Sequence, residues 1–166
     1  MLTQKRLKEL LHYDESTGVF TWRVAKSHRM RVGSVAGSVA LPKGYIRIKI
    51  DCRNYLAHRL ALFYVHGVFP ASETDHINRI KTDNRIANLR PCTQSENNKN
   101  THVNAKNTSG FKGVSRYRGK WTARGAINGT RHYLGYFPTA EAASEAYEAF
   151  ARQNHGAFYL PQKVAR

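Results

Sequence analysis

The chain has 166 residues, enough for one ordinary domain or two small ones. Its 27 lysines and arginines stand against 11 acidic residues, and the formal charge of +16 favours a polyanionic partner, nucleic acid before an anionic membrane surface. No apolar run approaches the roughly 20 residues of a membrane-spanning helix, the N-terminus contains no secretory core, and the two isolated cysteines imply no disulfide framework and suit a reducing cytosol.

The first 70 residues predict a β-rich segment with two helices. The expected elements, in chain order, are a helix over 1–11, strands over 18–23 and 44–50, a turn over 51–54 and a helix over 58–66. Residues 44–50 alternate apolar and basic side chains with a period of two, so that the isoleucines face a core while Arg47 and Lys49 face solvent. Gly67 is expected to end the second helix.

The second block, residues 71–103, predicts the order strand, polar loop, strand, helix. Strands are expected at 74–77 and 89–90, and Thr93 with Glu96 forms a capping box that starts a helix. We expect this arrangement to bring together the side chains of an acid and a histidine on the first strand and an amide on the helix. These residues are Asp75, His76 and Asn97.

A polar linker over 104–110 precedes a third block over 111–166. Three antiparallel strands and one helix are expected there, with a tight hairpin turn at Asn128 and Gly129 and a helix that begins after Pro138. In the middle strand, alternation predicts that Trp121, Ala123 and Ile127 face the helix and that Lys120, Thr122 and Arg124 face away from it. The whole chain is therefore expected to be an α+β protein.

An acid beside a histidine, with two amides downstream, indicates metal-assisted phosphodiester cleavage. A neutral imidazole can accept a proton from water near pH 7, which makes His76 the candidate general base. The carboxylate of Asp75 and the amide oxygen of Asn97 are hard ligands that suit Mg²⁺ or a similar cation such as Mn²⁺. Asn88 is expected to complete the catalytic group by tying the polar loop that orients the histidine.

The second block resembles the HNH family of nucleases, in which the Asp-His, Asn, Asn pattern matches Asp75-His76, Asn88 and Asn97. The first block, which includes residues 55–61, resembles the segment that precedes HNH motifs in phage homing-type endonucleases. The resemblance implies a ββα-metal fold, a metal held by the acid and the last amide, a histidine base, and a product with a 5′ phosphate. It also implies a phage or bacterial protein of the cytoplasm.

The third block resembles the Apetala-two, or ethylene-response-factor, DNA-binding domain of plants. The matching residues are Gly113-Val114, Gly119-Lys120-Trp121, Leu134-Gly135, Phe137, Thr139-Ala140-Glu141-Ala142-Ala143, Ala146-Tyr147 and Gly156. This resemblance implies a three-stranded antiparallel sheet that packs on one helix and contacts double-stranded DNA. The expected protein is thus a monomeric, site-specific homing-type endonuclease with an appended DNA-binding domain.

The candidate DNA-contacting residues are cations and one tyrosine distributed over all three blocks. They are Arg47, Lys49, Arg85, Arg90, Lys112, Arg116, Arg118, Lys120, Arg124, Arg131 and Tyr133. Most would contact phosphates and fix position on the duplex, while Arg124 and Arg131 are the candidates for reading base edges in the major groove.

Plainer interpretations stay open. The chain could be a DNA-binding regulator on a silent nuclease scaffold, or an RNA-binding basic protein, although the narrow major groove of A-form RNA disfavours a groove-reading sheet. The third block could be a solvated basic sheet without a ligand. His58 and His66 are expected to pack within the structure. A zinc site built from them together with Cys52 and Cys92 matches no common spacing.

Overall fold

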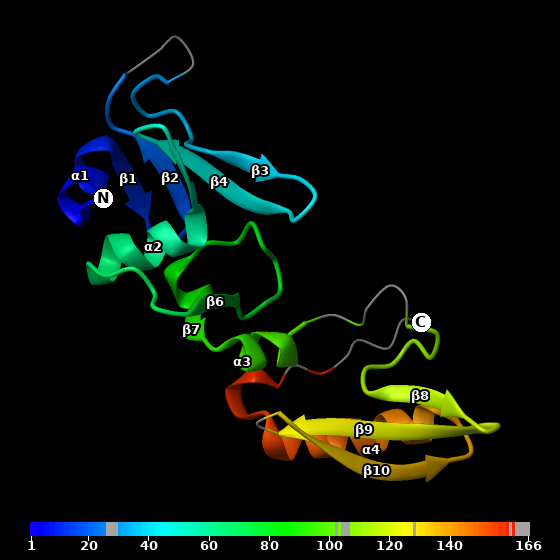
Figure 1. Ribbon diagram of the computed structural model, residues 1–166. Helices are drawn as coiled ribbons and strands as arrows, with labels where there is room; N and C mark the ends of the chain where they lie inside the picture. Colours follow the sequence, from blue (N-terminus) through cyan, green and yellow to red (C-terminus); the bar gives the residue numbers. More distant parts are fainter. Residues whose placement is uncertain (26–29, 102, 104–106, 128, 160, 162–166) are drawn as a thin grey trace. The chain divides into compact units, whose positions relative to one another are not determined.

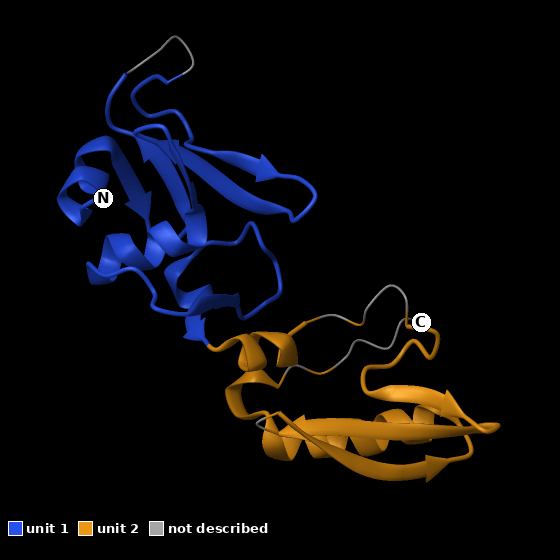
Figure 2. Ribbon diagram, viewed as in Figure 1, with its two compact units in different colours: residues 1–92 blue, residues 93–166 orange. Residues whose placement is uncertain are grey.

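The computed structural model describes residues 1–25, 30–101, 103, 107–127, 129–159 and 161. The fold is α+β with small antiparallel sheets, as the sequence predicted. The chain divides into two compact units, Met1–Cys92 (unit 1) and Thr93–Arg166 (unit 2), which Figure 2 shows in blue and orange. This division falls inside the predicted nuclease block over 71–103, so the strands of that block belong to unit 1 and its helix belongs to unit 2.

Unit 1 contains three small sheets and two helices (Figure 1). In chain order its elements are α1 (Gln4–Leu10), β1 (Leu11–Asp14), β2 (Val19–Trp22), β3 (Ser38–Ala40), β4 (Tyr45–Ile50), β5 (Arg53–Leu56), α2 (Ala57–His66), β6 (Glu73–His76), η1 (Ile86–Asn88) and β7 (Leu89–Cys92). Strand β1 pairs with β2, β4 pairs with β3 and β5, and β6 pairs with β7, all antiparallel.

The core of unit 1 forms where the two helices meet the first two sheets. Its buried members include Leu7 of α1, Phe20 of β2 and Leu60 of α2. The predicted alternation along β4 is confirmed, because Ile48 and Ile50 are buried while the basic residues between and before them are exposed. Gly67 ends α2 with a φ of 78°, also as predicted.

Two predictions for unit 1 were incomplete. The first helix ends at Leu10, and Leu11 starts strand β1, which the sequence analysis did not separate from the helix. The expected four-residue turn over 51–54 is shorter, since Asp51 and Cys52 alone turn the chain with φ angles of 44° and 64°. A two-residue turn with positive φ at both positions matches the twist of an antiparallel hairpin, so Arg53 already belongs to β5.

Unit 2 contains a short helix followed by a three-stranded sheet and a longer helix. Its elements are α3 (Gln94–Lys99), β8 (Val114–Tyr117), β9 (Lys120–Ile127), β10 (Thr130–Phe137), α4 (Ala140–Asn154) and η2 (Gly156–Phe158). The predicted capping box is present at the start of α3. Strand β9 lies between β8 and β10, and Ile127 pairs with Thr130 across the predicted two-residue hairpin; Asn128 of that turn, like residues 104–106 of the predicted linker, lies outside the described residues.

Helix α4 packs on one face of this sheet, around a core that includes Ala123, Ala143 and Tyr147. Strand alternation defines the opposite face, which we call the open face. It carries Ser115, Tyr117, Lys120, Thr122, Arg124, Ala126, Arg131, Tyr133 and Tyr136.

Thr122 departs from the prediction for the open face, because its side chain is fully buried there rather than exposed. Its hydroxyl lies 3.1 Å from the hydroxyl of Ser115, and its cross-strand neighbour on the other side is Tyr136. Tyr117 and Tyr133 contact the ring of Tyr136, and all three rings remain about half exposed. Strand alternation predicts the face on which a side chain lies, but not how far larger neighbours cover it. Here the tyrosine side chains cover the small hydroxyl between them.

Candidate active site and DNA-facing surface

His76 is the last residue of β6, and its side chain is 5% exposed. Its Nε2 lies 3.2 Å from Oδ1 of Asn84, while Nδ2 of the same amide donates to the carbonyl oxygen of Thr82 at 3.4 Å. Because the amide oxygen can only accept, Nε2 of the neutral imidazole must carry the proton. This tautomer leaves Nδ1 as the nitrogen that can take a proton from water.

Asn84 is itself held rigidly by the N-terminal part of unit 1. The residue is 1% exposed, and the hydroxyl of Tyr13 donates to its backbone oxygen at 2.6 Å. Gly18, with a φ of 73°, lies so close to the backbone of Asn84 and Arg85 that any Cβ at this position would overlap it. Neither Asn84 nor Tyr13 could be assigned a role from the sequence, because no local pattern reveals a contact between residues 71 positions apart.

Two rings, one buried and one half-buried, lie beside the imidazole of His76. The ring of His58 lies edge to face with it at 5.0 Å, and the ring of Tyr45 lies 5.9 Å away. Burial lowers the pKa of His76, although the Asn84 hydrogen bond and the charge of Asp75 oppose that shift. A lowered pKa keeps the imidazole neutral at pH 7, which is the form that a general base requires.

His58 is buried as predicted, whereas His66 is exposed at the end of α2 and does not pack within the structure. Burial lowers the pKa of His58 to about 3, with smaller contributions from His76 and Arg59. The four residues of the zinc alternative do not form a metal-binding group, since the described residues contain no cluster of three or more His, Cys, Asp or Glu side chains suited to an ion.

Asp75 precedes His76 on β6 and is equally buried. Its Oδ2 accepts hydrogen bonds from Nε and Nη2 of Arg90 at 2.8 and 2.6 Å, and the two residues face each other in the register of β6 and β7. Arg90, expected to contact a phosphate, thus neutralises the carboxylate. Arg85, another expected phosphate contact, pairs with Asp83 at 2.6 Å and lowers the pKa of that carboxyl to about 2.

Asn88 lies at the end of η1 and ties together the loop between β6 and β7. Its Nδ2 donates to Oδ1 of Asn78 at 3.0 Å and to the backbone oxygen of Asp83 at 2.8 Å. Its Oδ1 accepts from the backbone N–H of Asn78 at 3.0 Å. The amide therefore closes both ends of the loop that carries Asn84.

Asn97 lies on α3 and therefore in unit 2. Its backbone N–H donates to the carbonyl oxygen of Thr93 at 2.9 Å, within the first turn of the helix. The residues predicted as metal ligands thus come from different compact units, Asp75 from unit 1 and Asn97 from unit 2.

The donor chemistry of these two residues fits a hard divalent cation. A carboxylate and an amide supply oxygen ligands only, and two protein ligands leave room for the waters and phosphate oxygens that Mg²⁺ prefers. The Asp75 carboxylate is buried, and Asp75 and His76 are the last two residues of β6. Its ion pair with Arg90 means that the guanidinium and a cation would share this carboxylate.

The candidate DNA-contacting residues occupy several different places. Arg47 and Lys49 are exposed on β4 of unit 1. The open face of unit 2 carries the largest group, which consists of Lys120, Arg124, Arg131 and Tyr133.

Three other predicted contacts in unit 2 lie away from that group. Arg116 lies over the ring of Trp121 at 5.9 Å, on the side of the sheet that faces α4. Arg118 is in the turn between β8 and β9, 5.4 Å from the ring of Tyr117. The ammonium of Lys112 donates to backbone oxygens around the end of α3.

Residues 55–99 match the sequence model of the HNH endonuclease family. A stretch of 52 residues is 50% identical to the ethylene-responsive transcription factor ERF084 of Arabidopsis thaliana; it covers 30% of this chain and spans only a fifth of the length of that relative. A solved structure described as DNA binding and cleavage by the HNH homing endonuclease I-HmuI is similar over 82% of this chain and 76% of its own, with a TM-score of 0.44 and 21% identity. In the described residues, no helix has the length and apolarity that crossing a bilayer requires.

Proposed function

We propose that this protein is a DNA endonuclease that hydrolyses phosphodiester bonds with His76 as the general base and a divalent cation as cofactor. The match of residues 55–99 to the HNH endonuclease family carries the proposal. That stretch contains Asp75, His76, Asn88 and Asn97, so the residues expected to do the chemistry all lie within it.

His76 is prepared for proton transfer by its surroundings. Oδ1 of Asn84 accepts a hydrogen bond from Nε2–H, so Nδ1 is the atom that would take a proton from the attacking water. Burial keeps the ring neutral at pH 7, and the hydrogen bond from Tyr13 to the Asn84 backbone holds the acceptor in place. A positioned base of this kind contributes about 10²- to 10⁴-fold to the rate.

Asp75 and Asn97 are the residues that would hold the cation, through a carboxylate and an amide oxygen. When bound, Mg²⁺ or Mn²⁺ would stabilise the charge on the departing 3′ oxygen. Arg90 orients the Asp75 carboxylate, because it donates two hydrogen bonds to one carboxylate oxygen. Asn88 holds the loop around these groups.

Unit 2 is proposed to bind double-stranded DNA through its open face. The half-exposed tyrosines and the cations Lys120, Arg124 and Arg131 give this face both charge and base-edge donors. The relative ERF084 is named a transcription factor, which agrees with a role in DNA recognition. An added reader of this kind would make a monomeric nuclease site-specific, as a homing-type enzyme must be.

The test is nicking of supercoiled plasmid by the purified protein with and without Mg²⁺. We expect cation-dependent nicking by the wild type, loss of about 10²-fold or more in His76→Ala, and DNA binding nearly unchanged. His66→Ala is the matched control, since this histidine is exposed at the end of α2 and has no role in the proposed chemistry. Wild-type rates in the His76→Ala protein would refute the assignment.

A DNA-binding regulator without catalysis is the second candidate. The ion pair between Arg90 and Asp75 favours it, because a carboxylate already neutralised has less charge to offer a cation. The same assay decides between the two functions. A wild-type protein that shifts duplex DNA in a gel but never nicks it with Mg²⁺ or Mn²⁺ is a regulator.

A further inference from the structure

We propose that Lys112 is a positioning residue of the nuclease: its ammonium fixes the C-terminal end of α3 and thereby the presentation of Asn97. This inference rests on the proposed function for its catalytic meaning, but the structural part can be tested alone. Sequence patterns favour Lys112 as a DNA contact, and the hydrogen bonds of its side chain point to a different role.

The ammonium of Lys112 lies among the last carbonyl groups of α3. Nζ donates to the backbone oxygens of Lys99 at 2.6 Å, Asn98 at 3.0 Å and Thr101 at 3.3 Å. The final carbonyls of a helix have no partner within the helix, and a cation beside them also interacts favourably with the helix dipole. Three backbone acceptors match the three protons of an ammonium group.

Helix α3 needs such support because it has little of its own. It is six residues long, and none of its residues is buried. A helix of this length is unstable in isolation, since propagation over six residues does not recover the cost of its first turn. The capping box of Thr93 and Glu96 secures its N-terminal end, and Lys112 secures the other end.

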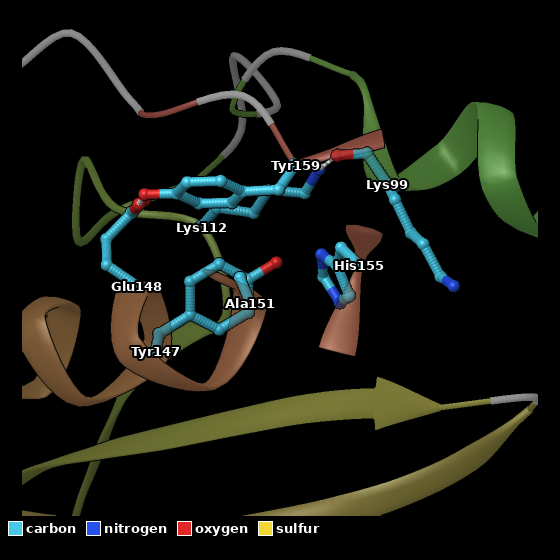
Figure 3. Close-up of a pocket in the computed structure, with 7 residues that line it drawn as sticks. All are labelled: Lys99, Lys112, Tyr147, Glu148, Ala151, His155 and Tyr159. Atoms are coloured by element: carbon cyan, nitrogen blue, oxygen red, sulfur yellow. Dashed lines mark hydrogen bonds between the residues drawn. The ribbon is translucent and has the colours of Figure 1, made fainter. Parts of the chain in front are cut away.

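Lys112 is attached to the core of unit 2 through the residue that follows it. Gly113 has a φ of 73°, lies directly against the ring of the buried Tyr147, and accepts a hydrogen bond from the N–H of Arg124 at 2.8 Å. Figure 3 shows Lys112 beside Tyr159 with its bond to the backbone oxygen of Lys99. The Lys112 side chain thus connects the end of α3 with the core of unit 2.

The orientation of Asn97 follows from this attachment. Its carbonyl accepts from the N–H of Asn100, and the two carbonyls after it are the ones bonded to Lys112. Without the ammonium the last turn would fray, and the amide of Asn97 would sample more directions. We therefore expect Lys112 to affect catalysis through the geometry of Asn97, not through contact with DNA.

The first experiment measures amide hydrogen exchange of residues 97–101 in the full-length protein. In Lys112→Met we expect these amides to exchange about tenfold faster than in the wild type, as loss of bonds to a charged donor implies. Lys112→Arg should behave like Lys112→Met, because a planar guanidinium cannot direct donors at three converging oxygens. Lys5→Met, an exposed lysine of α1, is the charge control and should leave residues 97–101 unchanged.

The second experiment separates kcat from DNA affinity in the same variants. A positioning role predicts about tenfold lower kcat in both Lys112 variants with DNA affinity and its salt dependence unchanged. A phosphate contact predicts the reverse: weaker binding and a lower salt slope in Lys112→Met, and near wild-type behaviour in Lys112→Arg. That second pattern, with unaltered exchange at residues 97–101, would overturn the proposal.

The outcome is separable from that of the proposed function. If the wild type does not nick DNA at all, the nuclease assignment fails, and the exchange measurement still decides whether Lys112 holds α3. If the wild type nicks DNA and the exchange of residues 97–101 is the same in Lys112→Met, the nuclease assignment stands and the role of Lys112 is wrong.

Discussion

The two units hold their candidate catalytic residues in different ways. In unit 1, His76 is buried, and Asn84, which bonds to it, is locked by Tyr13 from the opposite end of that unit's sequence. In unit 2, Asn97 lies on a helix without buried residues, whose two ends are secured by a capping box and by Lys112. The base is thus supported by packing, and the proposed ligand by polar bonds at helix ends. Substitutions near His76 should therefore act through buried contacts, and substitutions near Asn97 through the hydrogen bonds at the ends of α3.

The largest effect should come from adding a Cβ at Gly113, where the backbone lies directly against the ring of Tyr147 in unit 2. In Gly113→Ala the new Cβ would meet the buried ring and approach the backbone oxygen of Arg124 to 2.7 Å, in a backbone conformation that disfavours alanine. We expect unit 2 to lose about 3 kcal/mol of stability while unit 1 keeps its own. Segment-resolved hydrogen exchange of the full chain measures both.

Gly119→Ala is the matched control for that substitution. Gly119 has a φ of 78°, but no atom lies within 4 Å of the position of its missing Cβ. It should therefore show only the backbone cost, about 1 kcal/mol. Equal losses in the two variants would mean that Gly113 matters for its φ and not for its contact with Tyr147.

The next effect concerns the hydrogen bond to His76 in unit 1. Asn84→Leu keeps the approximate volume of the side chain but removes the acceptor of the Nε2 proton. We expect kcat to fall about 10- to 100-fold with DNA affinity unchanged, as for other groups that orient a catalytic histidine. Nitrogen NMR of the imidazole should show Nε2–H in the wild type and a mixture of tautomers in the variant.

Asn54→Leu serves as the control, because Asn54 is exposed on β5 of the same unit. A wild-type tautomer and a wild-type kcat in Asn84→Leu would show that the imidazole is oriented by other neighbours.

The contacts behind the Gly113 and Asn84 predictions also show which features of the fold a sequence pattern can predict. Local rules were sufficient for the alternation in β4, the capping box at Thr93 and the hairpin after Ile127, because each depends on neighbours a few residues apart. The metal-ligand and base assignments came from the pattern of an acid, a histidine and two amides together with a family resemblance, and they stay predictions. The Tyr13–Asn84 bond and the Lys112 bonds to α3 could not be predicted, because they join segments whose proximity only the fold creates.

A smaller effect is expected when pH falls, and it should arise in unit 1. The buried His58 has a pKa of about 3, below the value of about 6.5 for an unfolded histidine, so the unfolded chain binds a proton more readily than the folded one. The stability of unit 1 is then fully present above about pH 6.5 and falls by about 1.4 kcal/mol per pH unit below it, from this group alone. Burial of His76 acts in the same direction.

His58→Phe checks this assignment. The variant should lose less stability than the wild type between about pH 7.5 and about pH 4.5, measured by denaturant unfolding at each pH. Parallel losses in the two proteins would place the acid sensitivity elsewhere, and unit 2, with its own buried His155, would be the next place to test.

The smallest effect should be seen in the salt dependence of DNA binding, and it distinguishes the open face of unit 2 from the remaining basic surface. Lys120→Gln removes a cation from that face, and the slope of log affinity against log salt should fall by about one if the lysine contacts a phosphate. Lys5→Gln removes the same charge from the exposed surface of α1 in unit 1 and should leave the slope unchanged. Equal slopes in all three proteins would mean that the open face does not contact the backbone of DNA. Equal reductions in both variants would mean that the charge of the whole chain, and not this face, drives binding.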